Sequence, residues 1–135
     1  MSTHCGIAIK TEKGYETIYV HSDGYPEYMW PMLTENYNSE ELAAKLVSMG
    51  DASSINKLIA PNPNKPHDFM NPQEDVCIFY HRDRGDDWES CRPVCYTRRE
   101  LFRQPSFEYV HIFEDGQWNS YNMNGIKVNW WLNVM

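Results

Sequence analysis

Two short segments of the chain place histidine, aspartate and glycine in the same order. His21-Ser22-Asp23-Gly24 follows one apolar run, and His81-Arg82-Asp83-Arg84-Gly85 follows another. Each segment is expected at the end of a β-strand, where loops carry functional side chains on a rigid scaffold. Imidazole and carboxylate groups act as general acids and bases in catalysis and as ligands of metal ions. If the strands are neighbours, the repeat predicts one site at which four titratable groups meet.

The other residues near these strand ends favour ligand binding over a reaction. Arginine presents forked donors to phosphate or carboxylate groups, and aromatic rings stack on flat bases. We therefore expect a site for a nucleotide-like small molecule, with no catalytic residue, cofactor or metal assigned. Its expected members are His21, Asp23, Tyr25, Trp30, His81, Arg82, Asp83 and Arg84.

Two other interpretations of these residues stay open. Histidines at strand ends and aspartates in turns often hydrogen-bond the backbone, and alternating arginines and aspartates pair on a surface. The histidines and aspartates would also suit a small hydrolase. The sequence has no nucleophile elbow, no phosphate-binding glycine-rich loop and no His-Glu-x-x-His motif.

The cysteines leave a zinc site open. Cys77 precedes His81 by four positions, as Cys91 precedes Cys95, so four soft ligands would meet if the segments are neighbours. Structural zinc sites favour tighter Cys-x2-Cys pairs, which makes buried thiols the favoured interpretation. The sequence shows no secretory signal and no membrane-spanning stretch, and a cytoplasmic protein with reduced thiols is expected.

Length and composition predict one globular domain over residues 1–135, long enough to bury a sizeable core. The formal net charge of −7 disfavours direct binding to nucleic acid. Aromatic residues make up 14% of the chain, and such residues supply both cores and interfaces. Trp130-Trp131 suits either the core or a homodimer contact, and both interpretations stay open. The acidic and aromatic surface also suits a protein that blocks a partner protein.

Local patterns predict the elements that position these residues. Residues 5–10 and 15–21 are expected to form a hairpin around a glycine-containing turn. A helix is expected from Pro26, a second over 38–50 with Asn38 as its cap, and a further short helix within 51–59.

The second half is expected to hold a mostly apolar central strand over 76–81 and a short helix over 97–103 that opens with a capping box. The remaining elements are a loop over 60–73, an edge strand within 91–96, hairpin strands over 107–113 and 117–121, and a last strand or tail at 126–131. Together the elements predict an α+β fold, an antiparallel sheet built from hairpins with two or three helices packed on one face.

Five segments spread over most of the chain resemble a family of small proteins encoded by bacteriophages, prophages and other mobile elements. The family usually has arginine after Met-Ser-Thr, where this chain has His4. The segments are Met1-Ser2-Thr3-His4-Cys5-Gly6-Ile7, His21-Ser22-Asp23-Gly24-Tyr25-Pro26-Glu27, Glu35-Asn36-Tyr37, Gly50-Asp51-Ala52-Ser53-Ser54 and His81-Arg82-Asp83-Arg84-Gly85.

The resemblance implies an accessory phage protein that acts in the host cytoplasm. Small phage proteins of this kind often counter host defence, by sequestering a nucleotide signal or by binding a defence protein. We therefore expect an antagonist of host antiviral defence that sequesters a nucleotide-like signal. A protein that blocks a host defence protein is the alternative, and a small hydrolase that uses histidine and aspartate is the third hypothesis.

Overall fold

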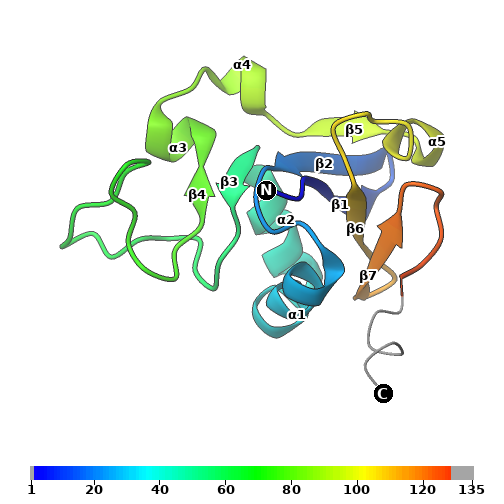
Figure 1. Cartoon of the computed structure of the whole chain (residues 1–135), viewed down its shortest axis with the longest axis horizontal. Coiled ribbons are helices and arrows are strands. Elements are labelled where there is room, and N and C mark those ends of the chain that lie inside the picture. Colours follow the sequence, from blue (N-terminus) through cyan, green and yellow to red (C-terminus); the bar gives the residue numbers. More distant parts are fainter. Residues whose placement is uncertain (1, 129–135) are drawn as a thin grey trace.

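The computed structural model describes residues 2–128, which form one sheet of seven strands and five helices (Figure 1). The expected α+β class is confirmed. The strands are β1 (Cys5–Thr11), β2 (Gly14–Val20), β3 (Ala52–Ser54), β4 (Ile78–Phe79), β5 (Val94–Tyr96), β6 (Tyr109–Glu114) and β7 (Gln117–Asn122). The helices are α1 (Pro26–Asn36), α2 (Glu40–Ser48), α3 (Tyr80–Arg84), α4 (Trp88–Cys91) and α5 (Arg98–Leu101).

The sheet has the strand order β4-β3-β2-β1-β6-β7, and β5 pairs with β2 outside this path. The β1–β2 and β6–β7 hairpins are antiparallel, as expected. Two other pairings, β1–β6 and β2–β3, are parallel, so the sheet is mixed rather than wholly antiparallel. Turn residues predict hairpins, but nothing local predicts which distant strands become neighbours.

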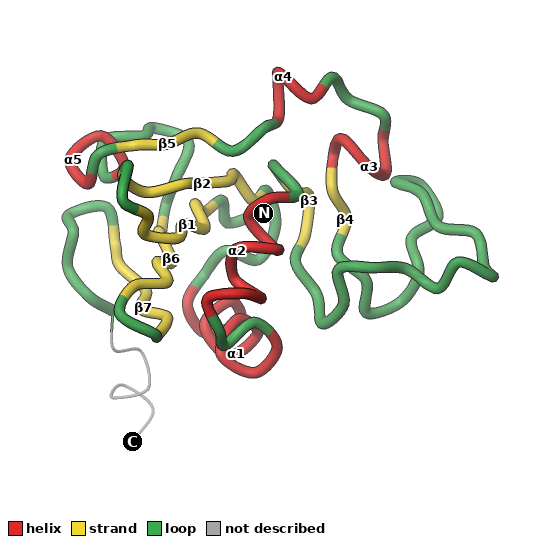
Figure 2. The backbone as a smooth tube through the Cα atoms, turned by 180° about the vertical axis from the view of Figure 1, so that it is seen from behind, coloured by secondary structure: helices red, strands yellow, loops and turns green. Residues whose placement is uncertain are grey.

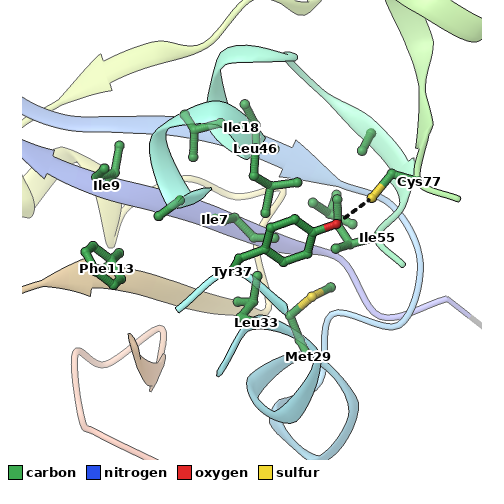
Figure 3. Close-up of a cluster of buried hydrophobic side chains, with 14 of the residues drawn as sticks. Ile7, Ile9, Ile18, Met29, Leu33, Tyr37, Leu46, Ile55, Cys77 and Phe113 are labelled. Carbon is green, nitrogen blue, oxygen red and sulfur yellow. Dashed lines mark hydrogen bonds between the residues drawn. The ribbon is translucent and has the colours of Figure 1, made fainter. Parts of the chain in front are cut away.

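One face of the sheet carries the main core. Cys5, Ile7 and Ile9 alternate along β1 and are buried against α1 and α2, as the period of two along a strand requires. Figure 3 shows Tyr37 in the middle of this core, with its hydroxyl directed at Cys77. Their Oη and Sγ atoms are 3.4 Å apart. The two longest helices therefore cover this face together.

The opposite face carries a smaller apolar cluster around Ala8, Val110 and Leu101. The chain from β5 through α5 to Phe107 covers this face, and Phe107 packs directly on Gly6. A Cβ atom at Gly6 would lie 2.6 Å from the Phe107 ring, so only glycine permits this close approach. The expected capping box of α5 is present.

Several local expectations are corrected by the structure. The segment 51–59 contains β3 instead of a helix, because α2 ends at Ser48, Gly50 turns the chain in a left-handed conformation (φ 83°) and Ala52 then pairs with Val20 of β2. Ser39, not Asn38, caps α2. The strand expected over 76–81 covers two residues before α3 begins.

Near the C-terminus, Lys127 forms an isolated bridge to Tyr121. The expected Trp130-Trp131 contact lies outside the described residues. None of the helices within residues 2–128 is long and apolar enough to cross a membrane.

Candidate functional site

The two histidine–aspartate segments do not end neighbouring strands. β3 lies between β2 and β4, and it runs parallel to β2 but antiparallel to β4. β2 and β4 therefore run in opposite directions, and their carboxyl ends face opposite ends of the sheet. His21 follows β2, whereas His81 is the second residue of α3. The long-range pairing thus separates two segments whose local sequences are alike.

The second segment contains a hydrogen-bond network that serves the backbone. The Asp83 carboxylate accepts hydrogen bonds from the Phe79 amide (2.8 Å) and from Arg82 Nε (2.7 Å). The Arg82 guanidinium also donates to the carbonyls of Ile59 and Cys77. Burial raises the pKa of Asp83, but the hydrogen bonds from Arg82 and Phe79 outweigh it and hold the pKa below its usual range.

His67 completes this network from the loop. Its Nδ1 accepts from the Gln73 amide (2.9 Å), so its Nε2 carries the proton and faces Asp83 Oδ1 at 3.2 Å. The side chains of His67 and Asp83 are 4% and 2% exposed. We call Arg82, Asp83 and His67 the Arg82–Asp83 network. It ties both ends of the segment 59–77 to α3, the arrangement expected of a structural network.

The remaining members of the second segment also have intramolecular partners. Arg84 forms two hydrogen bonds to the Asp86 carboxylate, at 2.8 and 2.7 Å. Its guanidinium stacks over the rings of Tyr80 and Phe69. His81 Nδ1 donates to the Asp86 carbonyl at 2.8 Å. The structure thus gathers these side chains around α3, where they pair with one another.

The first segment is divided between the two faces of the sheet. Asp23 has φ 57° in the turn before α1. Tyr25 precedes α1 and lies 6.1 Å from the Tyr28 ring. Trp30 packs on the main core and donates from Nε1 to the carbonyl of Trp118. These residues shape the entry to α1, whereas His21 lies on the opposite face.

A buried histidine outside the predicted set anchors this turn. His111 Nε2 donates to the Gly24 carbonyl and Nδ1 accepts from the Ser120 hydroxyl, each at 2.7 Å. Burial lowers the pKa of His111 to about 4, although the bond to Gly24 raises it. A neutral ring with both nitrogens bonded is a structural histidine.

A cavity opens where β3 and β5 diverge from β2. β5 pairs with residues 15–17 of β2, and β3 pairs with Val20. Between these pairings the Tyr19 amide donates instead to Asp51 Oδ1, at 2.8 Å. The cavity has a volume of about 270 Å³, and we call it the β2–β5 pocket. It is lined by Thr17, Tyr19, Asp51, Val94, Tyr96, Gln104, Ser106 and Phe107.

Asp51 is held in the pocket by its own backbone. Its amide donates to the Cys91 carbonyl at 2.8 Å, directly after the left-handed Gly50. Burial raises the pKa of Asp51 to about 6, although the bond from the Tyr19 amide lowers it. Within residues 2–128 no cationic side chain forms an ion pair with Asp51, and its Oδ2 accepts no hydrogen bond. An uncompensated carboxyl in a cavity is typical of a functional site.

Aromatic rings line the pocket beside this carboxyl, and two imidazoles contact one of these rings. The Tyr19 and Phe107 rings stack at 6.4 Å, with 19° between their planes. The Tyr19 hydroxyl lies 2.9 Å from His21 Nδ1, and His4 Nδ1 donates to the His21 carbonyl at 2.7 Å. The two imidazole rings are 4.5 Å apart. His4 and His21 therefore contact the Tyr19 side chain without lining the pocket itself.

Sequence reasoning named none of the residues that line this pocket, although His21, which it did name, contacts the Tyr19 hydroxyl. Asp51 falls at the start of the short helix expected within 51–59, and its one other signal is the segment Gly50-Asp51-Ala52-Ser53-Ser54 of the phage-family resemblance. Tyr96 and Phe107 approach it only because β5 and the loop after α5 fold over the sheet.

The four residues of the open zinc interpretation lie in different surroundings. Cys77 contacts Tyr37 and Asn56, while Cys91 Sγ donates to the Asp87 carbonyl. Among residues 2–128 the structure has no group of three or more metal-ligating side chains that could hold an ion.

Comparisons with protein families, with characterised proteins and with solved structures found no match for this chain. The side chains of the β2–β5 pocket are therefore the observations from which a function can be proposed.

Proposed function

We propose that this protein binds and sequesters a nucleotide-like small molecule in the β2–β5 pocket. The observation that carries the proposal is the Asp51 carboxyl, which no cation neutralises, among the rings of Tyr19, Tyr96 and Phe107. Aromatic rings stack on any nucleic-acid base, because every base has a flat π-face. A few polar groups within an apolar wall then fix the orientation of a bound molecule.

The size of the pocket bears on which part of the ligand it holds. Its volume of about 270 Å³ is just below the range of about 300–1,000 Å³ for drug-sized ligands. A base or nucleoside fits that space, and a whole dinucleotide does not. Any phosphate would extend past Tyr19 toward His4 and His21, whose rings lie beyond it.

The phage-family resemblance suggests a biological setting for this binding. A protein that holds a nucleotide-like defence signal would lower its free concentration in the host cytoplasm. The protein would then act as an antagonist of host antiviral defence, without a chemical step.

Native mass spectrometry of the protein purified from cells with active phage defence tests the proposal. We expect a stoichiometric adduct that denaturation releases as a nucleotide-like molecule. Tyr96→Ala removes a wall of the pocket and is expected to abolish the adduct. Tyr25→Ala is the matched control, because Tyr25 belongs to the entry of α1. A bare protein mass, or loss of the adduct in the control alone, contradicts the proposal.

A second candidate function is the blocking of a host defence protein. Met70 is 80% exposed on the segment 59–77 that the Arg82–Asp83 network closes, and Leu58, which directly precedes this segment, is 54% exposed. Figure 2 shows this segment extending beyond β3 and β4, away from the rest of the sheet. Exposed apolar side chains on a fixed loop are suited to contact with another protein.

Affinity purification from infected cells separates this candidate from the first. It predicts one stoichiometric host protein that Met70→Glu releases. Ile126→Glu is the matched control, because Ile126 is 60% exposed but lies after β7. Recovery of the chain without a protein partner contradicts this candidate.

A further inference from the structure

We infer that the β2–β5 pocket selects a base with two adjacent hydrogen-bond donors, as on the N1–H and N2–H edge of guanine. This inference rests on the proposed function and names its ligand class. It depends on which donors and acceptors of the pocket are already used within the chain.

Asp51 supplies the recognition group. An ionised carboxylate accepts hydrogen bonds and donates none. Its Oδ1 accepts one bond from the Tyr19 amide, and each carboxylate oxygen has two lone pairs, so Oδ1 keeps one acceptor position and Oδ2 keeps both. Two such oxygens side by side match two parallel N–H groups, as in arginine–carboxylate pairs. The N1–H and N2–H groups of guanine have this arrangement.

The neighbouring side chains add further acceptors. The Thr17 hydroxyl donates its hydrogen bond to the Tyr15 carbonyl (2.9 Å), so it can only accept a hydrogen bond from a ligand. Gln104 Nε2 donates to the Glu100 carbonyl (3.0 Å), and its Oε1 accepts no bond from residues 2–128. The Asp51 end of the pocket therefore offers acceptors to a ligand, which disfavours a base that presents acceptors there, while the hydroxyls of Tyr96 and Ser106 can donate to other ligand atoms.

The three common purine nucleosides differ at this edge. Guanosine offers two donors to Asp51, inosine keeps N1–H but lacks the amino group, and adenosine presents the N1 acceptor to the carboxylate. A hydrogen bond to a charged group contributes enough to change affinity by roughly 10–100-fold. We therefore expect guanosine to bind most tightly. The affinity for inosine is expected to be at least roughly tenfold lower, and the affinity for adenosine lowest of the three.

Calorimetric titration of the full chain with the three nucleosides, at about pH 8 where Asp51 is ionised, tests the inference. Guanosine binding at least roughly tenfold tighter than adenosine supports it. Equal binding of all three overturns the inference and leaves the proposed function standing. Binding of none at millimolar concentration overturns both.

The variant Asp51→Asn tests whether the Asp51 carboxyl causes the preference for guanosine over adenosine. The amide oxygen keeps the bond from the Tyr19 amide, while the NH2 group places a donor where guanine needs an acceptor. We expect guanosine affinity to fall roughly 10–100-fold and the preference over adenosine to vanish. Asp115→Asn, an exposed carboxyl in the β6–β7 turn, is the matched control. Preserved guanosine preference in a folded Asp51→Asn protein overturns the assignment, and thermal melting establishes that the variant is folded.

Discussion

Asp51 occupies a position where asparagine would serve the fold better. Its structural partner is one backbone amide, that of Tyr19, and an amide oxygen satisfies that donor equally well. The ionised carboxyl loses hydration in the pocket without an ion pair in return within residues 2–128. A residue that is unfavourable for stability and faces a cavity is expected where a protein uses it for binding.

Asp51→Asn is predicted to stabilise the protein in a pH-dependent way. The pKa of Asp51 rises from 3.8 to about 6 on folding. The native state therefore binds the proton more tightly, and stability falls as pH rises through this window. We expect a gain of about 1–2 kcal/mol at about pH 8, after allowance for solvent screening, and little change at about pH 4. Urea unfolding at both pH values measures it, and equal gains at both would contradict the assignment.

Arg82 and Arg84 are neighbours in α3 with opposite surroundings. Arg82→Ala removes bonds to two carbonyls and leaves the buried Asp83 carboxylate without its main partner. We expect a loss of about 2–3 kcal/mol in the free energy of unfolding. Arg84→Ala is the matched control and is expected to lower the urea midpoint much less than Arg82→Ala does, because the Arg84–Asp86 pair is partly exposed to solvent. Similar midpoints for the two variants would show that the Arg82–Asp83 network does not stabilise the fold.

At the scale of elements, the turn between α2 and β3 decides where Asp51 lies. Gly50 and Gly85 both have φ 83°, but they differ in their neighbours. A Cβ atom at Gly50 would lie 2.5 Å from the Cys91 carbonyl oxygen, whereas one at Gly85 would meet nothing within 4 Å. That carbonyl also accepts the Asp51 amide, so this close packing of α4 positions the carboxyl.

Alanine at each glycine separates backbone strain from steric clash. Gly85→Ala is expected to lower the free energy of unfolding by about 1 kcal/mol, the penalty of a left-handed non-glycine residue. Gly50→Ala adds the clash and is expected to lower it by about 2–4 kcal/mol and to weaken ligand binding. Denaturant titration with calorimetry measures both effects. Equal losses of stability would mean that α4 moves freely away from the turn.

The elements show which parts of the fold local sequence can predict. Both hairpins and the α5 capping box follow from signals within a few residues, such as Asp115-Gly116 and Thr97 with Glu100. The β2–β3 and β1–β6 pairings join segments far apart in the chain, and no local pattern encodes them. The β2–β5 pocket depends on the pairings of β3 and β5 with β2, so the sequence alone did not predict Asp51 or Tyr96 as site residues.

At the scale of the whole molecule, the sheet is covered on both faces, and this determines thiol reactivity. Cys5, Cys77 and Cys91 are buried, whereas Cys95 is exposed on β5. Burial raises the pKa of the Cys5 thiol far above its usual range, which suppresses the reactive thiolate. We expect one fast thiol in the native protein and four in denaturant, measured with a chromogenic disulfide reagent. Cys95→Ser should remove the fast reaction, and its persistence would show that a covered face opens.

The Arg82–Asp83 network has a consequence for the continuity of the chain. It binds the start of the segment 59–77 at the Ile59 carbonyl and its end at the Cys77 carbonyl, beside the paired strands β3 and β4. A backbone break at the exposed residues between Pro61 and Pro72 would therefore leave the two parts of the segment bonded to α3 at Ile59 and at Cys77. Two separately expressed pieces divided there are expected to reassociate into a folded heterodimer, which makes this loop a site for a split reporter.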